Sequence, residues 1–155
     1  ALDQKTAYEI IEVLKEIKQK TQVTICFISH QLDVVRQICD RVIVMDDAKI
    51  VEEKDTRSLF THPEHHVTKS LVESVLESNV TQTSDVYKLV YTSKAINQTI
   101  LSDVIKKYDI NTNIIHAKSI ELKDEMIGYL WIQITGINKE KAIQELSDHG
   151  IEVIA

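Results

Sequence analysis

The sequence has 155 residues, 43% hydrophobic and 27% charged, a composition typical of folded domains that excludes an intrinsically disordered chain. Its formal net charge is -6 with acidic and basic residues interspersed, so it offers no basic surface for nucleic acid or for an anionic membrane. No apolar stretch approaches the roughly 20 residues that cross a bilayer, so any membrane association is expected through a partner.

The first predicted elements are a helix over residues 4–20, with Asp3 as its N-cap, and a strand over Val23–Ile28. The strand is apolar almost throughout, a pattern typical of a strand buried on both faces. It ends in Ser29-His30, at the end of a strand where α/β proteins place ligand-handling groups. His30 is therefore a candidate phosphate sensor, although from the pattern alone a strand-end histidine with a backbone partner is the simpler alternative.

The rest of the first half is predicted to alternate short helices and strands. Helices are expected over residues 31–39, 56–60 and 67–77, and strands over residues 41–45 and 50–53, the first of them buried. Asp46–Lys49 is the expected turn between the two strands. Cys26 and Cys39 have no metal-like spacing and are expected to be reduced, packed thiols.

Three histidines near the middle of the chain have a spacing that can place imidazoles on one helical face. They are His62, His65 and His66. Because Pro63 interrupts the helix and no cysteine or well-placed carboxylate completes a ligand set, a solvated helix entry is favoured over zinc.

Residues 78–85 are polar and lack apolar periodicity, as expected of a linker between packed units. The predicted domains are therefore residues 1–77 and 86–155, with 78–85 between them. After the linker we expect strands over residues 86–91, 113–122, 126–135 and 151–154, and helices over residues 97–108 and 139–148. This βαββαβ order predicts an α+β ferredoxin-like sandwich. So small a unit has a limited core, which favours pairing with a second copy.

Polar and aromatic side chains in the second half are candidates for ligand contacts. Asn111 and Asn113 flank Thr112 at the edge of a predicted strand, where loop chemistry alone explains such residues. Tyr129 and Trp131 lie on one face of the next strand and are expected in a core or an interface rather than a stacking platform. In the second helix of this half, Asn138 is the predicted N-cap and Gly150 lies just past the end.

Several of these segments resemble the ATP-binding subunits of ABC transporters, and more specifically those of methionine importers. Leu2-Asp3 resembles their D-loop, and Ile28–Gln31 resembles their H-loop. The second half resembles the NIL domain, whose Asn-Ile-Leu stretch reads Asn113-Ile114-Ile115 here, and Gly128–Gly136 is similar to that domain's alternating strand. The resemblance covers nearly the whole chain and implies the tail of an α/β P-loop ATPase domain followed by an ACT-like regulatory domain.

The resemblance implies that Ala1, Leu2 and Asp3 bind nucleotide and that His30 contacts the γ-phosphate of ATP, with Mg²⁺ present in the intact subunit. A P-loop needs glycine-rich backbone amides followed by Lys and Ser or Thr, and the only glycines here are Gly128, Gly136 and Gly150. The P-loop, signature and Walker B motifs are therefore expected before Ala1, and this chain alone is not expected to hydrolyse ATP. Ala48 stands where the family usually has a turn glycine.

For the NIL part, the resemblance implies that cytoplasmic L-methionine binds at Asn111, Asn113, Ile114 and Ile115 and inhibits transport. It further implies a homodimer at the cytoplasmic face of the cell membrane, held there by transmembrane permease subunits and, through them, linked to a substrate-binding lipoprotein. No metal beyond Mg²⁺ and no nucleic acid are implied.

Two alternatives remain open from the sequence. The chain could be an amino-acid-sensing binding module with a non-functional ATPase remnant, which the coding sequence upstream of Ala1 would decide. It could also belong to an importer for another amino acid, because pocket selectivity depends on a few side chains.

Overall fold

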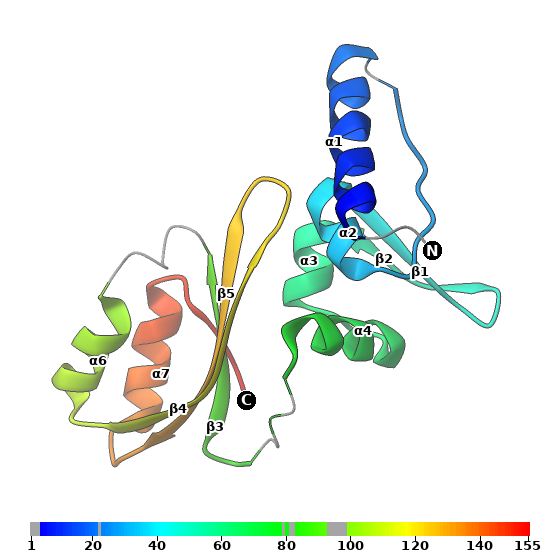
Figure 1. The fold of residues 1–155 in the computed structure, drawn as a ribbon. Helices are drawn as coiled ribbons and strands as arrows, with labels where there is room; N and C mark the ends of the chain where they lie inside the picture. The colour runs from blue at the N-terminus through cyan, green and yellow to red at the C-terminus, as the bar shows by residue number, and fades with distance from the viewer. Residues whose placement is uncertain (1–3, 22, 79, 81–82, 93–98) are drawn as a thin grey trace. The chain divides into compact units, whose positions relative to one another are not determined.

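The computed structural model describes residues 4–21, 23–78, 80, 83–92 and 99–155. The chain divides into two compact units, residues 1–75 and residues 76–155, which are considered separately below. We call them the first unit and the second unit (Figure 1).

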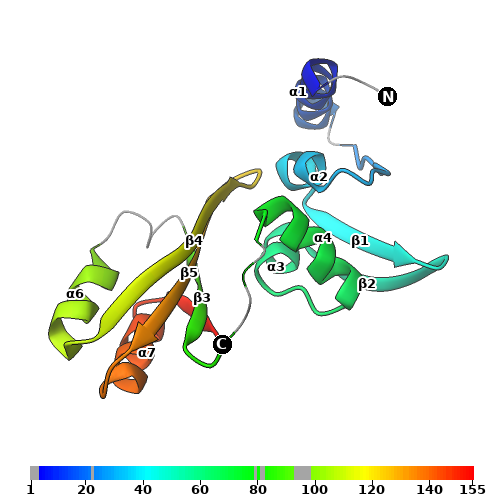
Figure 2. The same cartoon turned by 60° about the horizontal axis from the view of Figure 1, so that its bottom comes forward.

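The first unit is built around a two-stranded antiparallel hairpin. Its described elements are α1 (Gln4–Thr21), α2 (Leu32–Ile38), β1 (Arg41–Asp46), β2 (Lys49–Asp55), α3 (Thr56–Thr61) and α4 (His66–Leu76), the last ending at the unit boundary. Asp55 begins α3 as its N-cap, because its carboxylate accepts a hydrogen bond from the Ser58 amide at 2.8 Å. Figure 2 shows α3 beside the hairpin.

The turn of this hairpin lies at the predicted position and has a strained backbone. Asp47 and Ala48 both have positive φ, 47° and 57°. Two consecutive residues of positive φ suit a tight hairpin turn, in which glycine is preferred. Alanine at the second position therefore costs about 1 kcal/mol relative to glycine.

The predicted strand Val23–Ile28 is wrong, since residues 23–29 have no regular structure and their side chains are exposed. A strand that is apolar on both faces needs neighbouring strands at its edges and cover on both sides. Among the described residues of this unit, only β1 and β2 form a sheet. β1 is likewise half-buried rather than buried, with alternate residues exposed. Cys26 is exposed, contrary to the expectation of a packed thiol, whereas burial and the neighbouring Asp40 raise the pKa of the half-buried Cys39.

The second unit follows the predicted order of elements. They are β3 (Val86–Thr92), α6 (Ile100–Tyr108), β4 (Asn111–Glu121), β5 (Met126–Thr135), α7 (Lys139–Asp148) and β6 (Glu152–Ile154). The strands form one antiparallel sheet in the order β4-β5-β3-β6. Helices α6 and α7 lie side by side on one face of this sheet (Figures 1 and 2). The predicted start of the first helix, at residue 97, lies outside the described residues.

The core of the second unit lies between the sheet and its two helices. Leu89 of β3 and Ile132 and Ile134 of β5 are fully buried, as are Ala142 and Leu146 of α7. Complete burial of an aliphatic side chain as large as leucine or isoleucine stabilises a fold by about 1.5–3 kcal/mol. The alternation of the strands and the helical spacing predicted from the sequence thus produce one shared core.

The loops around α7 differ from the prediction in one detail. The Asn138 side chain makes no capping hydrogen bond, and its Nδ2–H instead donates to the Tyr108 carbonyl at 3.1 Å, tying the start of α7 to the end of α6. Gly150 has φ 79° just past the helix, a conformation in which glycine is favoured.

Candidate functional site

His30 lies at a bend between the irregular segment 23–29 and α2, with its side chain exposed. The Gln31 amide donates to the Ser29 hydroxyl at 3.0 Å, and the Gln31 carbonyl accepts from the Val34 and Val35 amides at 3.1 and 3.2 Å. The imidazole is thus presented to solvent directly before a helix start. Ala1, Leu2 and Asp3 lie outside the described residues, so the predicted nucleotide-binding group stays a prediction.

Asn111, Asn113, Ile114 and Ile115 come together on β4, an edge strand of the second sheet. Asn113 lies in the strand as predicted, and the strand extends back to Asn111 because β5 is long enough for Thr135 to pair with it. Both asparagines are exposed, and the side chains of Ile114 and Ile115 are 60% and 44% exposed. Asn113 opposes Gln133 and Ile114 opposes Ile132, so the exposed amides and the Ile114 side chain lie on opposite faces of this edge strand.

A β-bulge interrupts the pairing of β4 with β5. Ile114 pairs with Ile132 and His116 pairs with Trp131, so Ile115 is the extra residue. Directly opposed residues of an antiparallel pair project from the same face. Ile114 therefore shares the helix-covered face with the core residue Ile132, whereas the bulge returns His116 to the helix-free face.

An aromatic cluster with a cation occupies this helix-free face. The rings of Tyr129 and Trp131 stack with centroids 6.2 Å apart, and the His116 ring lies 5.2 Å from that of Trp131. The Lys88 ammonium lies over both large rings, 5.1 Å from the centroid of Tyr129 and 5.6 Å from that of Trp131. Tyr129 and Trp131 are buried, as expected of a core or interface, and burial with nearby Glu152 and Glu125 raises the pKa of Tyr129.

Lys88 and His116 were not among the residues that sequence reasoning selected. Side chains alternate along β3, so Lys88 lies on the same face as Val86 and Val90. This alternation could have predicted the face on which Lys88 lies. The position of His116 depends on the bulge, which no sequence signal marked.

A second unpredicted feature is a buried carboxylate in the first unit. Glu52 of β2 accepts hydrogen bonds from the backbone amides of Glu64 and His65 at 3.0 and 2.9 Å, and Lys54 lies 3.1 Å away. Burial alone would raise the pKa of Glu52, but the two backbone amides and the Lys54 ammonium hold it well below its usual range, at about 2. The carboxylate thereby joins the hairpin to the segment that leads into α4, which is a structural role.

The three histidines near this point have local partners. The His65 and His66 rings lie 4.3 Å apart, and His62 Nδ1 lies 2.8 Å from the Thr61 hydroxyl. Across the part of the chain that the structure describes, no group of three His, Cys, Asp or Glu side chains is placed to hold a metal ion.

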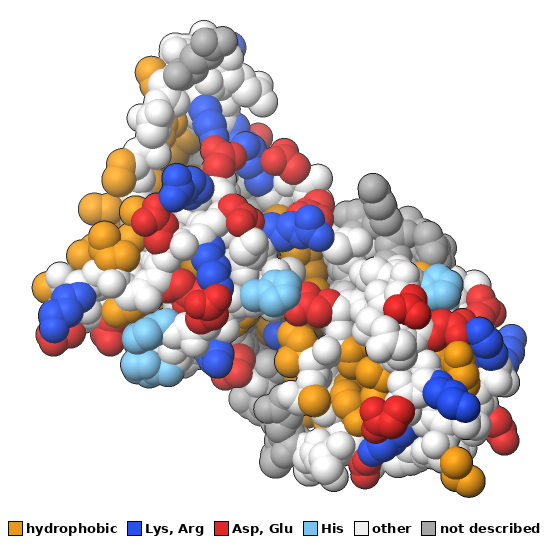
Figure 3. Space-filling model, turned by 180° about the vertical axis from the view of Figure 1, so that it is seen from behind, with side chains coloured by type: hydrophobic (Ala, Val, Ile, Leu, Met, Phe, Trp, Pro, Cys, Tyr) orange, Lys and Arg blue, Asp and Glu red, His pale blue; other side chains and the backbone are white. Residues whose placement is uncertain are grey.

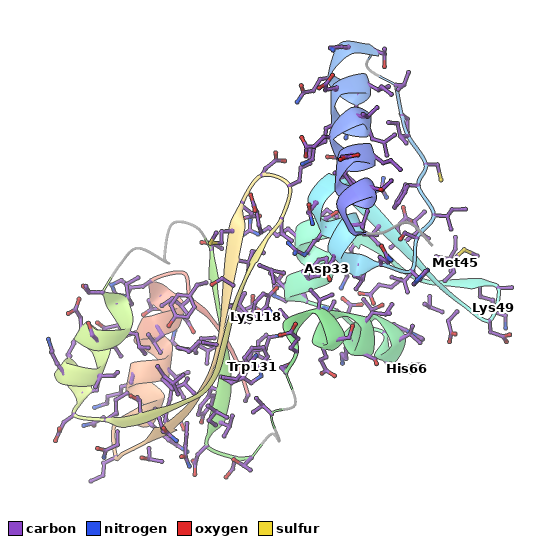
Figure 4. All side chains as sticks on the ribbon, in the orientation of Figure 1. Asp33, Met45, Lys49, His66, Lys118 and Trp131 are labelled. Carbon is purple, nitrogen blue, oxygen red and sulfur yellow. The ribbon has the colours of Figure 1, made fainter. Side chains whose placement is uncertain are left out.

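The first unit exposes a large amount of apolar surface. Ile43, Met45 and Ile50 of the hairpin are 53–62% exposed, and Ile28 of the irregular segment is 94% exposed. Figure 3 shows hydrophobic side chains gathered along one edge of this unit, and Figure 4 shows Met45 and Lys49 near the tip of the hairpin. An exposed apolar area of this kind is typical of a surface that contacts another protein segment or a partner.

Comparisons with known proteins find one family model that matches the second half of the chain and relatives that match nearly the whole chain. Residues 85–154 match the NIL domain family. A protein named methionine import ATP-binding protein MetN 2 from Acinetobacter baylyi is 29% identical over 99% of this chain and 48% of its own length. The corresponding MetN protein of Cupriavidus pinatubonensis is 33% identical over 99% of this chain and 49% of its own length. The chain spans about half the length of these relatives.

A solved structure titled as the C-terminal domain of an ABC transporter/ATP-binding protein from Enterococcus faecalis is 24% identical. It covers 54% of this chain and 92% of its own, with a TM-score of 0.40.

Residues 85–154 of the second unit are therefore similar to the NIL domain family. The chain as a whole resembles the C-terminal portion of methionine import ATP-binding proteins. In the described part of the chain, no helix is both long enough and apolar enough to span a bilayer.

Proposed function

We propose that this chain is the C-terminal portion of an ATPase subunit that powers methionine import. In this proposal residues 1–77 belong to an ABC ATPase domain, residues 78–85 link the domains, and residues 86–155 form the regulatory NIL domain. The observation that carries the proposal is the similarity to methionine import ATP-binding proteins along 99% of the chain. The NIL match at residues 85–154 supports it independently.

The exposed apolar surface of the first unit supports the assignment to a larger ATPase domain. Val23–Ile28 has the sequence of a buried central strand but pairs with no strand among the described residues, so we infer that the remainder of a sheet would cover it. In the intact subunit, the D-loop residues Ala1–Asp3 and the exposed His30 would lie near ATP. The His30 imidazole would donate a hydrogen bond to the charge that develops on the γ-phosphate, while motifs outside this chain hold Mg²⁺.

This assignment predicts the behaviour of the chain alone and of the intact subunit. The chain by itself should show no magnesium-dependent ATP hydrolysis after repurification. In the intact subunit, His30→Ala should reduce hydrolysis sharply and leave ATP binding within a few-fold, because the histidine acts mainly in the transition state. An equal loss of both would instead indicate a structural histidine.

The exposed residues of β4 support a binding site for an amino acid. The side-chain amides of Asn111 and Asn113 offer donors and acceptors for charged amino and carboxylate groups. Ile114 and Ile115, both exposed, offer apolar surface to a thioether side chain. We assign cytoplasmic L-methionine as the ligand, acting as an inhibitor of transport.

The element and strand orders support a ferredoxin-like domain that pairs with a second copy. The sheet order β4-β5-β3-β6 leaves β4, an 11-residue strand, at an edge. Such an edge presents unpaired backbone groups that a second copy can cover. The intact subunit would then work as a dimer bound to permease subunits at the cytoplasmic face of the membrane, and through them act with a lipoprotein. Sedimentation of the chain as a monomer throughout the micromolar range would contradict the pairing.

A thermal-shift panel of the twenty L-amino acids tests the ligand assignment. A ligand that binds the folded state alone raises the unfolding temperature in a concentration-dependent manner. L-methionine should give the largest shift, and D-methionine serves as a stereochemical control. A larger shift with another amino acid would reassign the importer, and no shift with any of them would remove the sensing role.

A further inference from the structure

Two residues at the start of the second unit, Leu76 and Glu77, contact side chains of β4. His116 Nε2–H donates to the Leu76 carbonyl at 3.1 Å, and the Lys118 ammonium lies 2.8 Å from the Glu77 carboxylate. Leu76 is the last residue of α4 and is fully buried. Two alternate residues of one strand therefore hold two consecutive residues at the end of a helix.

The backbone at Glu77, just past the end of α4, is strained. Its φ is 52°, in the left-handed region where glycine is favoured and other residues are strained. Strain of this kind persists where surrounding contacts over-determine the conformation. The glutamate supplies the carboxylate that pairs with Lys118, a contact that glycine could not make.

The β-bulge connects these contacts to the exposed residues of β4. Ile115 is the extra residue and directly precedes His116. Because side chains alternate along a strand, gain or loss of one bulged residue turns every following side chain to the other face. A ligand that tightens or releases the bulge would therefore redirect His116 and Lys118 together. Figure 4 labels Lys118 and Trp131 on this sheet.

We propose that His116 and Lys118 form a clamp that transmits ligand binding at residues 113–115 to the end of α4. The ligand, L-methionine, is taken from the proposed function, whereas the clamp itself rests on the contacts of residues 76, 77, 116 and 118. Coupling of this kind needs an element with two arrangements that the ligand distinguishes. In this proposal that element is the β-bulge at Ile115, and its two arrangements are β4 paired with β5 with the bulge and without it.

Amide hydrogen exchange over residues 66–78 of the full chain tests the clamp, with and without saturating L-methionine. The variant His116→Phe/Lys118→Ala removes both contacts and keeps an aromatic ring beside Trp131, whose fluorescence reports on folding. Without ligand, the variant should exchange about fivefold faster at residues 75–78, the expected effect of losing one or two such bonds. Lys106→Ala, which removes an exposed lysine of α6, is the matched control and should exchange like the parent.

The ligand arm separates the clamp from the proposed function. Methionine should change exchange in the last turn of α4 by at least about threefold in the parent, and the variant should bind methionine with similar affinity but lose that change. A variant with the two charges exchanged, Glu77→Lys/Lys118→Glu, keeps an ion pair between these positions. It should therefore retain part of the methionine-dependent change in exchange. A full response in the double variant would overturn the coupling. If the parent binds no methionine, the proposed function and the coupling both fail. The ligand-free comparison then tests the two contacts alone, and equal exchange rates in the parent and the double variant would overturn the clamp.

Discussion

Replacing Glu52 with glutamine should destabilise the first unit by about 2 kcal/mol at pH 7. The carboxylate is 5% exposed and accepts two backbone amides, at 3.0 and 2.9 Å. Hydrogen bonds to charged groups contribute about 1.5–3 kcal/mol each, and the glutamine amide retains one acceptor oxygen while turning its NH₂ group toward the other donor. A pKa of about 2 against an ordinary 4.5 corresponds to about 3 kcal/mol, which solvent near Lys54 reduces.

The pH dependence of this effect follows from the lowered pKa. The ionised carboxylate stabilises the folded state fully above about pH 4.5, and that contribution is lost as the pH falls toward 2. The difference between the parent and Glu52→Gln should therefore be largest at neutral pH and shrink toward pH 2. Glu53→Gln, on the same strand but with its side chain 43% exposed, should change stability by no more than about 0.5 kcal/mol.

Urea unfolding followed by two probes measures the effect. Trp131 is the sole tryptophan and lies in the second unit, so its fluorescence reports on that unit, whereas far-ultraviolet circular dichroism reports on both. The change should appear in the dichroism phase that fluorescence does not share. A loss below about 0.5 kcal/mol at pH 7, or an equal loss at pH 7 and pH 2.5, would refute the role given to Glu52.

Two further substitutions test the strained and buried positions by the same method. Ala48→Gly should stabilise the first unit by about 1 kcal/mol because Ala48 has φ 57°, and a decrease would show that the turn tolerates alanine without strain. Tyr91→Phe should stabilise the second unit by about 1 kcal/mol, since the buried Tyr91 hydroxyl has no hydrogen-bond partner among the described residues. Burial raises the pKa of Tyr91 to about 12, so the stability of the parent falls as the pH rises from about 10 toward 12, where the phenol ionises more readily in the unfolded chain, and the advantage of the variant grows over this range. In an absorbance titration of the tyrosines, the variant should lack the phenol that ionises at the highest pH. A titration curve identical to that of the parent would contradict the burial of Tyr91.

Local patterns in the sequence predict most of the second unit, and longer-range pairing explains what they miss. The periodicity of α7 and the alternation of β5 are properties of single segments, so both elements lie within a residue or two of prediction. The strand predicted to begin at Asn113 begins at Asn111, because the length of β5 extends the pairing. Burial of Val23–Ile28 depends on neighbouring strands, which local patterns cannot supply.

The contacts of the candidate sites depend even more on distant residues. The side of the sheet on which His116 lies is set by a bulge at Ile115, and no composition rule locates such a bulge. In the sequence, Glu52 is one of several charged residues in a polar strand, and nothing nearby marks it as buried. Its partners are backbone amides 12 and 13 residues away. Side-chain types predicted the candidate ligand contacts on β4, but only the three-dimensional pairing identifies the clamp beside them.

Calorimetric titration of L-methionine into the chain tests the central claim, that the NIL domain senses methionine through β4. The parent should bind, and Asn113→Ala should bind at least about tenfold more weakly, because the loss of one or two hydrogen bonds to charged groups costs about 1.5–3 kcal/mol each. Ser119→Ala, on the same strand and away from the exposed isoleucines, should bind like the parent, and all three proteins should unfold at similar temperatures without ligand. Absence of binding by the parent, or equal affinity in Asn113→Ala, would contradict the claim.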